Sequence, residues 1–145
     1  MTPFVLLIGL GVHAVFEGIS LGMSKQTHQT IIFAIAIILH KGAAGMSLGI
    51  SMAKTFPGQA FFCCKMIFLF SLFTPFGVAI GWGLLEDSNE MVEIWMTSLA
   101  AGTFLYIACS EIIVEEFSVP SHRFLKLFAY LVGIAIISSL KFLDA

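Results

Sequence analysis

Long apolar stretches alternate with short polar segments along the whole chain. A helix needs roughly 20 mostly apolar residues to cross the hydrocarbon core of a bilayer. Five stretches meet this requirement, and they cover residues 3–23, 30–53, 60–85, 92–114 and 124–143. Since short connections join antiparallel neighbours, the pattern predicts an all-α fold, a polytopic integral membrane bundle of five transmembrane helices.

The composition excludes an ordinary soluble domain. Hydrophobic residues make up 59% of the chain and charged residues only 11%, and the mean hydropathy is +1.01. Soluble domains are about one-quarter charged, and a soluble fold of this size has to expose much of its surface to water. We therefore interpret residues 1–145 as a single transmembrane domain in a lipid bilayer. The formal net charge of −2 argues against nucleic acid as a partner.

The charges in the connections predict an orientation. Lys54 and Lys65 flank the second connection, and Arg123 and Lys126 lie near the fourth. The third connection is acidic and lacks lysine and arginine; it contains Glu86, Asp87, Glu90 and Glu93. Because cytoplasmic loops carry the excess of basic residues, we expect the second and fourth connections in the cytoplasm and the acidic one outside. The N-terminus is then cytoplasmic.

A few ionisable side chains fall inside the predicted spans. Placing each of them in a bilayer costs free energy, so each indicates a functional or structural role. They are His13, Glu17, His40, Lys41 and Glu111. His13 and Glu17 are four residues apart, so their side chains share one helix face. His13 and His40 each lie roughly 15 Å from the first connection, at a rise of about 1.5 Å per residue. Antiparallel packing should therefore bring all three residues to one level.

Two imidazoles and a carboxylate are a common ligand set for zinc, and they also suit other first-row divalent ions. The alternative is a Glu–His hydrogen bond that joins two helices without a metal. Lys41 would discourage a second bound ion, or would neutralise Glu17 or Glu111. Glu111 is the fourth candidate metal ligand: it either accepts a departing ion or pairs with Lys41.

Glycine and proline add two packing signals. Glycines recur at four-residue spacing, as in Gly18 with Gly22 and Gly77 with Gly81, which allows helices to approach closely in lipid. Pro75 in the third span has no amide hydrogen, so the carbonyl of Ser71 loses its usual helical partner. The three cysteines, at positions 63, 64 and 109, show no spacing typical of a disulfide framework or a zinc knuckle.

Three motifs resemble the ZIP family of zinc and iron-like transporters. HAVFEGISLG (13–22) resembles that family's fourth transmembrane helix, HKGAAGMSLG (40–49) is similar to the fifth helix of its zinc-importing branch, and AGTFLYIACSEII (101–113) resembles the seventh. The resemblance implies helices four to eight of an eight-helix ZIP fold, an ion site between helices four and five, and zinc movement toward the cytosol. It implies a multi-pass protein, which we place in the plasma membrane. Iron, manganese and cadmium stay open as alternative ions. A homodimer stays open as the oligomeric state.

Four positions depart from the branches of the family that hold two metal ions. Ala14 stands where those branches often carry Asn, and Lys41, Ala44 and Thr74 stand where they carry acidic residues. The resemblance therefore implies one ion, held by His13, Glu17 and His40. Nothing corresponds to helices one to three, so we expect a truncated product, a partial gene model or a fragment.

Two other functions stay open for this sequence. One is a regulatory fragment that docks onto a full-length transporter without moving ions. The other is a membrane metalloenzyme whose metal activates water. The chain lacks an HExxH motif and offers no obvious separate general base, so we expect no enzyme and assign no catalytic residue.

Overall fold

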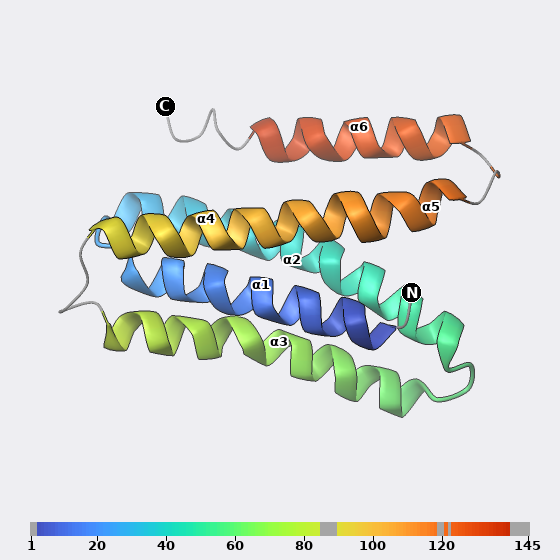
Figure 1. Cartoon of the computed structure of the whole chain (residues 1–145), viewed down its shortest axis with the longest axis horizontal. Helices are drawn as coiled ribbons and strands as arrows, with labels where there is room; N and C mark the ends of the chain where they lie inside the picture. Colours follow the sequence, from blue (N-terminus) through green and yellow to red (C-terminus); the bar gives the residue numbers. More distant parts are fainter. Residues whose placement is uncertain (1–2, 85–89, 119–120, 122, 140–145) are drawn as a thin grey trace.

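The computed structural model describes residues 3–84, 90–118, 121 and 123–139. Every element in this part of the chain is helical (Figure 1), which confirms the all-α fold class. The elements are α1 (Pro3–Met23), α2 (Thr27–Thr55), α3 (Ala60–Gly83), α4 (Glu90–Tyr106), the π-helical segment η1 (Ile107–Ile113), α5 (Val114–Ser118) and α6 (Arg123–Ser139).

Residues in the connections themselves explain how the chain passes from α1 to α2 and from α2 to α3. The hydroxyl of Thr30 donates to the Gln26 carbonyl and accepts from the Ser24 hydroxyl, which ties the start of α2 to the end of α1. Between α2 and α3, Gly58 has a φ of +83°, a left-handed conformation that favours glycine. Both connections are short, so α1, α2 and α3 run antiparallel in sequence order (Figure 1).

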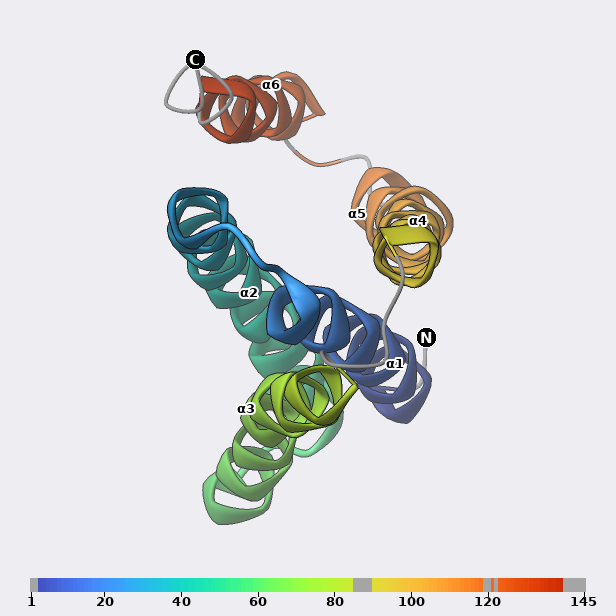
Figure 2. The same cartoon turned by 90° about the vertical axis from the view of Figure 1, so that its left-hand side faces the viewer.

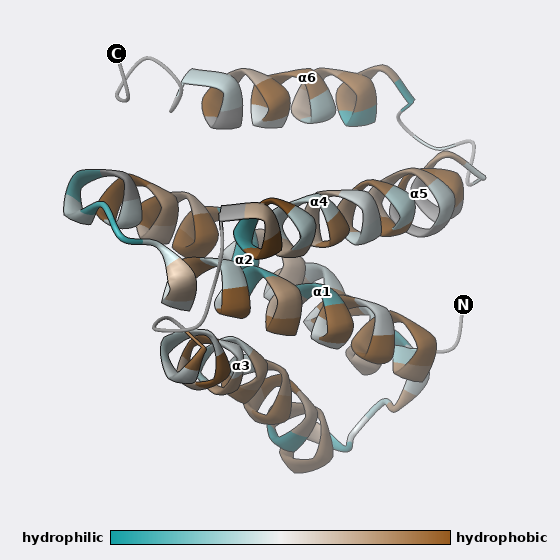
Figure 3. Cartoon of the chain, turned by 60° about the vertical axis from the view of Figure 1, so that its left-hand side comes forward, coloured by the Kyte–Doolittle hydropathy of each residue, from teal (hydrophilic) through white to brown (hydrophobic). Residues whose placement is uncertain are grey.

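Helix α1 lies at the centre of the bundle and packs against α2, α3 and α4 (Figure 2). Half of its apolar span is buried, compared with 17% for α2 and for α3. The most deeply buried side chains of the core include Leu10 of α1 and Leu48 and Met52 of α2. Apolar residues recur along all the helices (Figure 3), and many large apolar side chains are exposed, as expected where lipid is the solvent.

The closest packing joins α1 to α3 through two pairs of glycines. A Cβ added at Gly18 would lie 2.5 Å from the carbonyl oxygen of Thr74, and one added at Gly22 would lie 2.5 Å from that of Val78. From the other side, a Cβ at Gly77 would lie 3.0 Å from the Cα of Gly18. The two backbones therefore touch, which is how small residues hold membrane helices together.

The fourth apolar stretch differs from a plain helix. It begins as α4 and then changes to the wider π-helical form over Ile107–Ile113 before α5 follows. Single π-helical turns within α-helices leave no signal in the hydrophobic pattern.

Four helical stretches in the described residues are long and apolar enough to cross a membrane; they lie in α1, α2, α3 and Met91–Ser110. Helix α6 is a fifth helix, and residues 140–143 of the last predicted stretch lie outside the described part.

Candidate metal site

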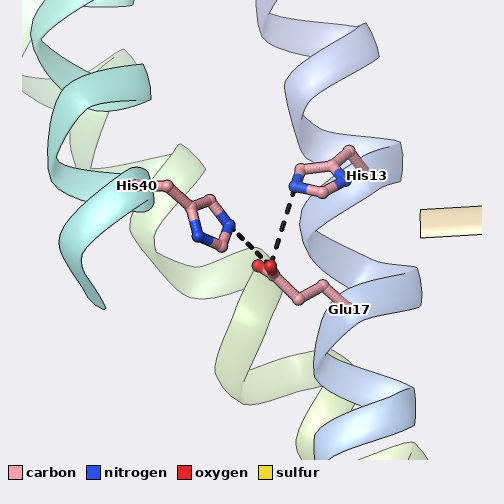
Figure 4. Close-up of side chains that lie close together, drawn as sticks. All are labelled: His13, Glu17 and His40. Carbon is pink, nitrogen blue, oxygen red and sulfur yellow. Dashed lines mark ion pairs between the residues drawn. The ribbon is translucent and has the colours of Figure 1, made fainter. Parts of the chain in front are cut away.

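Three side chains from α1 and α2 meet in the interior of the bundle (Figure 4). His13 and Glu17 project from successive turns of α1, and His40 reaches across from α2. One ligand atom from each residue lies within 4.8 Å of the other two. The level match predicted from the short first connection therefore holds in the structure.

The carboxylate of Glu17 lies between the two imidazoles. Its Oε1 atom is 2.6 Å from Nε2 of His40 and 3.8 Å from Nε2 of His13 (Figure 4). Two ligands of one tetrahedral zinc ion, each bound at about 2.0–2.1 Å, lie about 3.3 Å apart. The two observed separations fall on either side of that value, so small side-chain rotations would suit a shared ion.

Both imidazoles are oriented by main-chain carbonyl groups. Nδ1 of His13 donates to the Ala100 carbonyl of α4 at 2.9 Å, and Nδ1 of His40 donates to the Ala36 carbonyl one turn earlier in α2 at 2.7 Å. A carbonyl can only accept, so each Nδ1 carries a proton. The Nε2 atoms therefore face Glu17, the usual arrangement of a metal-binding histidine whose other nitrogen donates to a fixed acceptor.

The hydrogen bonding of the Nε2 atoms is incomplete. Nε2 of His13 is buried and has no hydrogen-bond partner among the described residues, although nearly all buried polar atoms are paired. Nε2 of His40 and Oε1 of Glu17 lie so close together that a proton must lie between them. The proton on Nδ1 of His40 is donated to the Ala36 carbonyl, so the proton between His40 and Glu17 is a different one. A divalent ion in this position would replace the shared proton and satisfy the unpaired nitrogen.

Burial is deepest for the two ligands on α1. His13 and Glu17 are only 6% and 4% exposed, while His40 is half-buried. The ring of Phe104, on α4, covers both imidazoles, with centroids 5.1 Å from His13 and 5.5 Å from His40. Neither Phe104 nor Ala100 stood out in the sequence, since an apolar residue in an apolar span gives no sign that it faces a site.

The contacts of Lys41 in the described part of the chain are with α3. Its ammonium group donates to the hydroxyl of Thr74, lies 3.5 Å from the Ser71 carbonyl oxygen, and sits 5.0 Å from the centre of the Phe70 ring. The ion pairs of Glu17 in the described residues involve the two histidines and not Lys41. Glu111 belongs to η1, but its side chain lies outside the described part, so its role as a ligand stays a prediction.

Comparison with known proteins identifies relatives over nearly the whole chain. A family profile described as ZIP Zinc transporter matches residues 1–141. The chain is 32% identical over 144 residues to zinc transporter ZIP1 of Bos taurus. The matched region covers 97% of this chain and 44% of the relative. It is 32% identical over 141 residues to zinc transporter ZIP2 of Mus musculus, covering 93% of this chain and 45% of the relative.

A third relative comes from another organism. Protein zntD of Dictyostelium discoideum is 35% identical over 138 residues, covering 92% of this chain and 20% of the relative. The chain thus spans less than half the length of these three relatives. No solved structure gives a significant match to the chain.

Proposed function

The chain belongs to the ZIP zinc transporter family, and from this premise we propose that it takes part in moving zinc across a membrane through the site formed by His13, Glu17 and His40. The observation that carries the proposal is the meeting of these three side chains inside the bundle, with their ligand atoms within 4.8 Å of one another. Membrane transporters commonly bind their ions near the bilayer midplane between packed helices. The zinc ion is the transported substrate and not a resident cofactor.

The three ligands that meet in the described residues suit transport better than a closed set of four would. A structural zinc site is closed by four protein ligands, whereas a site with three leaves a position for water or for an incoming group. An ion at this site could therefore exchange ligands during entry and release. We propose movement toward the cytosol from the resemblance to the zinc-importing branch, and the plasma membrane as the location.

Zinc is the ion most consistent with the relatives from Bos taurus and Mus musculus, which are both named zinc transporters. Iron, manganese and cadmium stay as alternatives because two imidazoles and one carboxylate bind several divalent ions. The family is one of transporters, so we propose no enzymatic activity for the chain.

Zinc binding by the purified chain tests the site directly. We expect the His13→Ala, His40→Ala double variant to bind zinc well over tenfold more weakly in a calorimetric titration. Loss of a residue that only hydrogen-bonds to a metal ligand typically lowers metal affinity 10–100-fold, and loss of a ligand should cost more. His28→Ala is the matched control, since His28 is exposed beside the first connection. Unchanged zinc affinity in the double variant would contradict the site.

Transport is measured in a longer protein, because the chain spans less than half of its relatives. The chain would be fused behind the N-terminal part of bovine zinc transporter ZIP1, and uptake of labelled zinc by cells expressing the fusion would be recorded. We expect the double variant to lose uptake at normal surface expression. If the histidines only join helices, expression should instead fail first, while the protein that reaches the surface still transports zinc.

A further inference from the structure

Thr74 joins three helices close to the candidate metal site. It lies in α3 and is only 9% exposed. Its hydroxyl accepts a hydrogen bond from the Lys41 ammonium of α2 and donates to the Ala14 carbonyl of α1 at 3.4 Å. A hydroxyl has one proton to donate and lone pairs to accept with, so the donor and acceptor functions of Thr74 are both in use.

The neighbourhood of Thr74 is suited to hold a cation. Pro75 has no amide hydrogen, so the Ser71 carbonyl is left without its helical donor and lies 3.5 Å from the Lys41 nitrogen. The face of the Phe70 ring lies on another side of the ammonium, with its centre 5.0 Å away, a distance at which aromatic rings attract cations. A hydroxyl, a free carbonyl and a ring thus hold the ammonium on α3.

The same ammonium is within electrostatic reach of Glu17 but does not contact it. Lys41 and Glu17 attract each other, yet the carboxylate pairs with the two histidines. In a poorly hydrated interior an unpaired cation is strongly driven toward the nearest anion. Without the hydroxyl of Thr74, Lys41 would therefore be free to pair directly with the oxygen that is offered to the metal.

We propose that Thr74 is a positioning residue that keeps Lys41 away from the Glu17 carboxylate, so that this carboxylate stays available to a divalent ion. The fixed ammonium then compensates part of the carboxylate charge without competing for its oxygen atoms. This inference rests on the proposed zinc site, because Glu17 matters here as a ligand.

The test is a cycle of variants in the full chain, with zinc affinity measured by titration. Thr74→Val removes the hydroxyl at nearly the same volume, and we expect it to weaken zinc binding by about tenfold or more, the usual effect of losing an outer partner of a metal site. Thr74→Ser keeps the hydroxyl and should bind zinc as the unmodified chain does. Thr74→Ala replaces the valine variant if that protein does not fold.

The decisive measurement is rescue by a second substitution. Lys41→Met removes the competing cation, so the Thr74→Val, Lys41→Met double variant should bind zinc within about twofold of Lys41→Met alone, the usual scatter of independent effects. A Thr74→Val loss that persists in the double variant would assign Thr74 a packing role and overturn the proposal. Unchanged affinity in Thr74→Val would overturn it as well.

Failure of the underlying site has a different signature. If the unmodified chain binds no zinc, or if the His13→Ala, His40→Ala variant binds it as well as the unmodified chain, the proposed function is wrong and the positioning role falls with it. If zinc binding requires both histidines but is indifferent to Thr74, only the positioning role is wrong.

Discussion

Glu17 is the residue on which the candidate site depends. Its carboxylate faces Nε2 of His13 within its own helix and Nε2 of His40 on the next. The two Nδ1 atoms donate to main-chain carbonyls of Ala36 and Ala100. Each carbonyl belongs to a helix and not to a mobile side chain, so the imidazoles are held before any ion arrives. Such preorganisation reduces the ordering cost of binding.

Lys41 should limit this site to one ion. A fixed cation within electrostatic reach of Glu17 raises the energy of placing a second divalent charge nearby. We expect purified chain to hold one zinc ion per molecule, measured by elemental analysis after removal of loosely bound metal. Lys41→Glu, which replaces the cation by an acid, is the companion variant and should admit a second ion. Two tightly held ions with Lys41 intact would show that the ammonium does not exclude a second ion.

Part of this site follows from the sequence, and part does not. His13 and Glu17 share a face because they are four residues apart, and His40 reaches their level because the connection between α1 and α2 is short. The partners Ala100 and Thr74 are 87 and 33 residues from the side chains they bind. Contacts at such separations depend on which helices become neighbours, and the hydrophobic pattern of a membrane helix does not encode that choice.

At the scale of the elements, the α1–α3 pair is the most tightly joined unit. Helix α3 is not the neighbour of α1 in sequence, yet their backbones touch at Gly18 and Gly77. The glycine spacing predicted close packing of some helices but not which ones. The five apolar stretches were visible because lipid requires them to be long, whereas the π-helical segment Ile107–Ile113 was not. Its wider turn changes hydrogen bonding and leaves composition unchanged.

Gly77→Ala should destabilise the protein. The added Cβ would lie 3.0 Å from the Cα of Gly18 and would overlap the carbonyl of Val15, and backbone atoms cannot move aside as flexible side chains do. Overpacking of this kind typically costs about 1–3 kcal/mol, seen as a lower unfolding temperature of the purified protein. Gly83→Ala, in the same helix with nothing within 4 Å of the added atom, should leave that temperature unchanged or raise it slightly. Equal effects of the two substitutions would refute the close approach.

At the scale of the whole molecule, α1 organises the bundle and carries two of the three ligands that meet in the described residues. The apolar stretches resemble one another in composition, so the sequence did not indicate which of them would be central. The structure distinguishes them by burial, with half of the α1 span covered and only 11% of the Met91–Ser110 stretch. Ligands on the central helix lie out of contact with lipid, which is where ionisable groups in a membrane are least costly.

The orientation of the bundle is the last expectation, and it stays a prediction that rests on the positions of the charges. Lys54 and Lys65 are exposed near the end where α2 leads into α3, and the acidic segment Glu86–Glu93 follows the opposite end of α3. Since basic residues are retained on the cytoplasmic side, the acidic segment should face outside. In a chain whose native cysteines are replaced, Ser88→Cys should react with a membrane-impermeant thiol reagent applied to intact cells, and Ser121→Cys should react only after permeabilisation. Labelling of Ser121→Cys but not Ser88→Cys in intact cells would invert the topology, and zinc held by His13, Glu17 and His40 would then reach its site from the other side of the membrane.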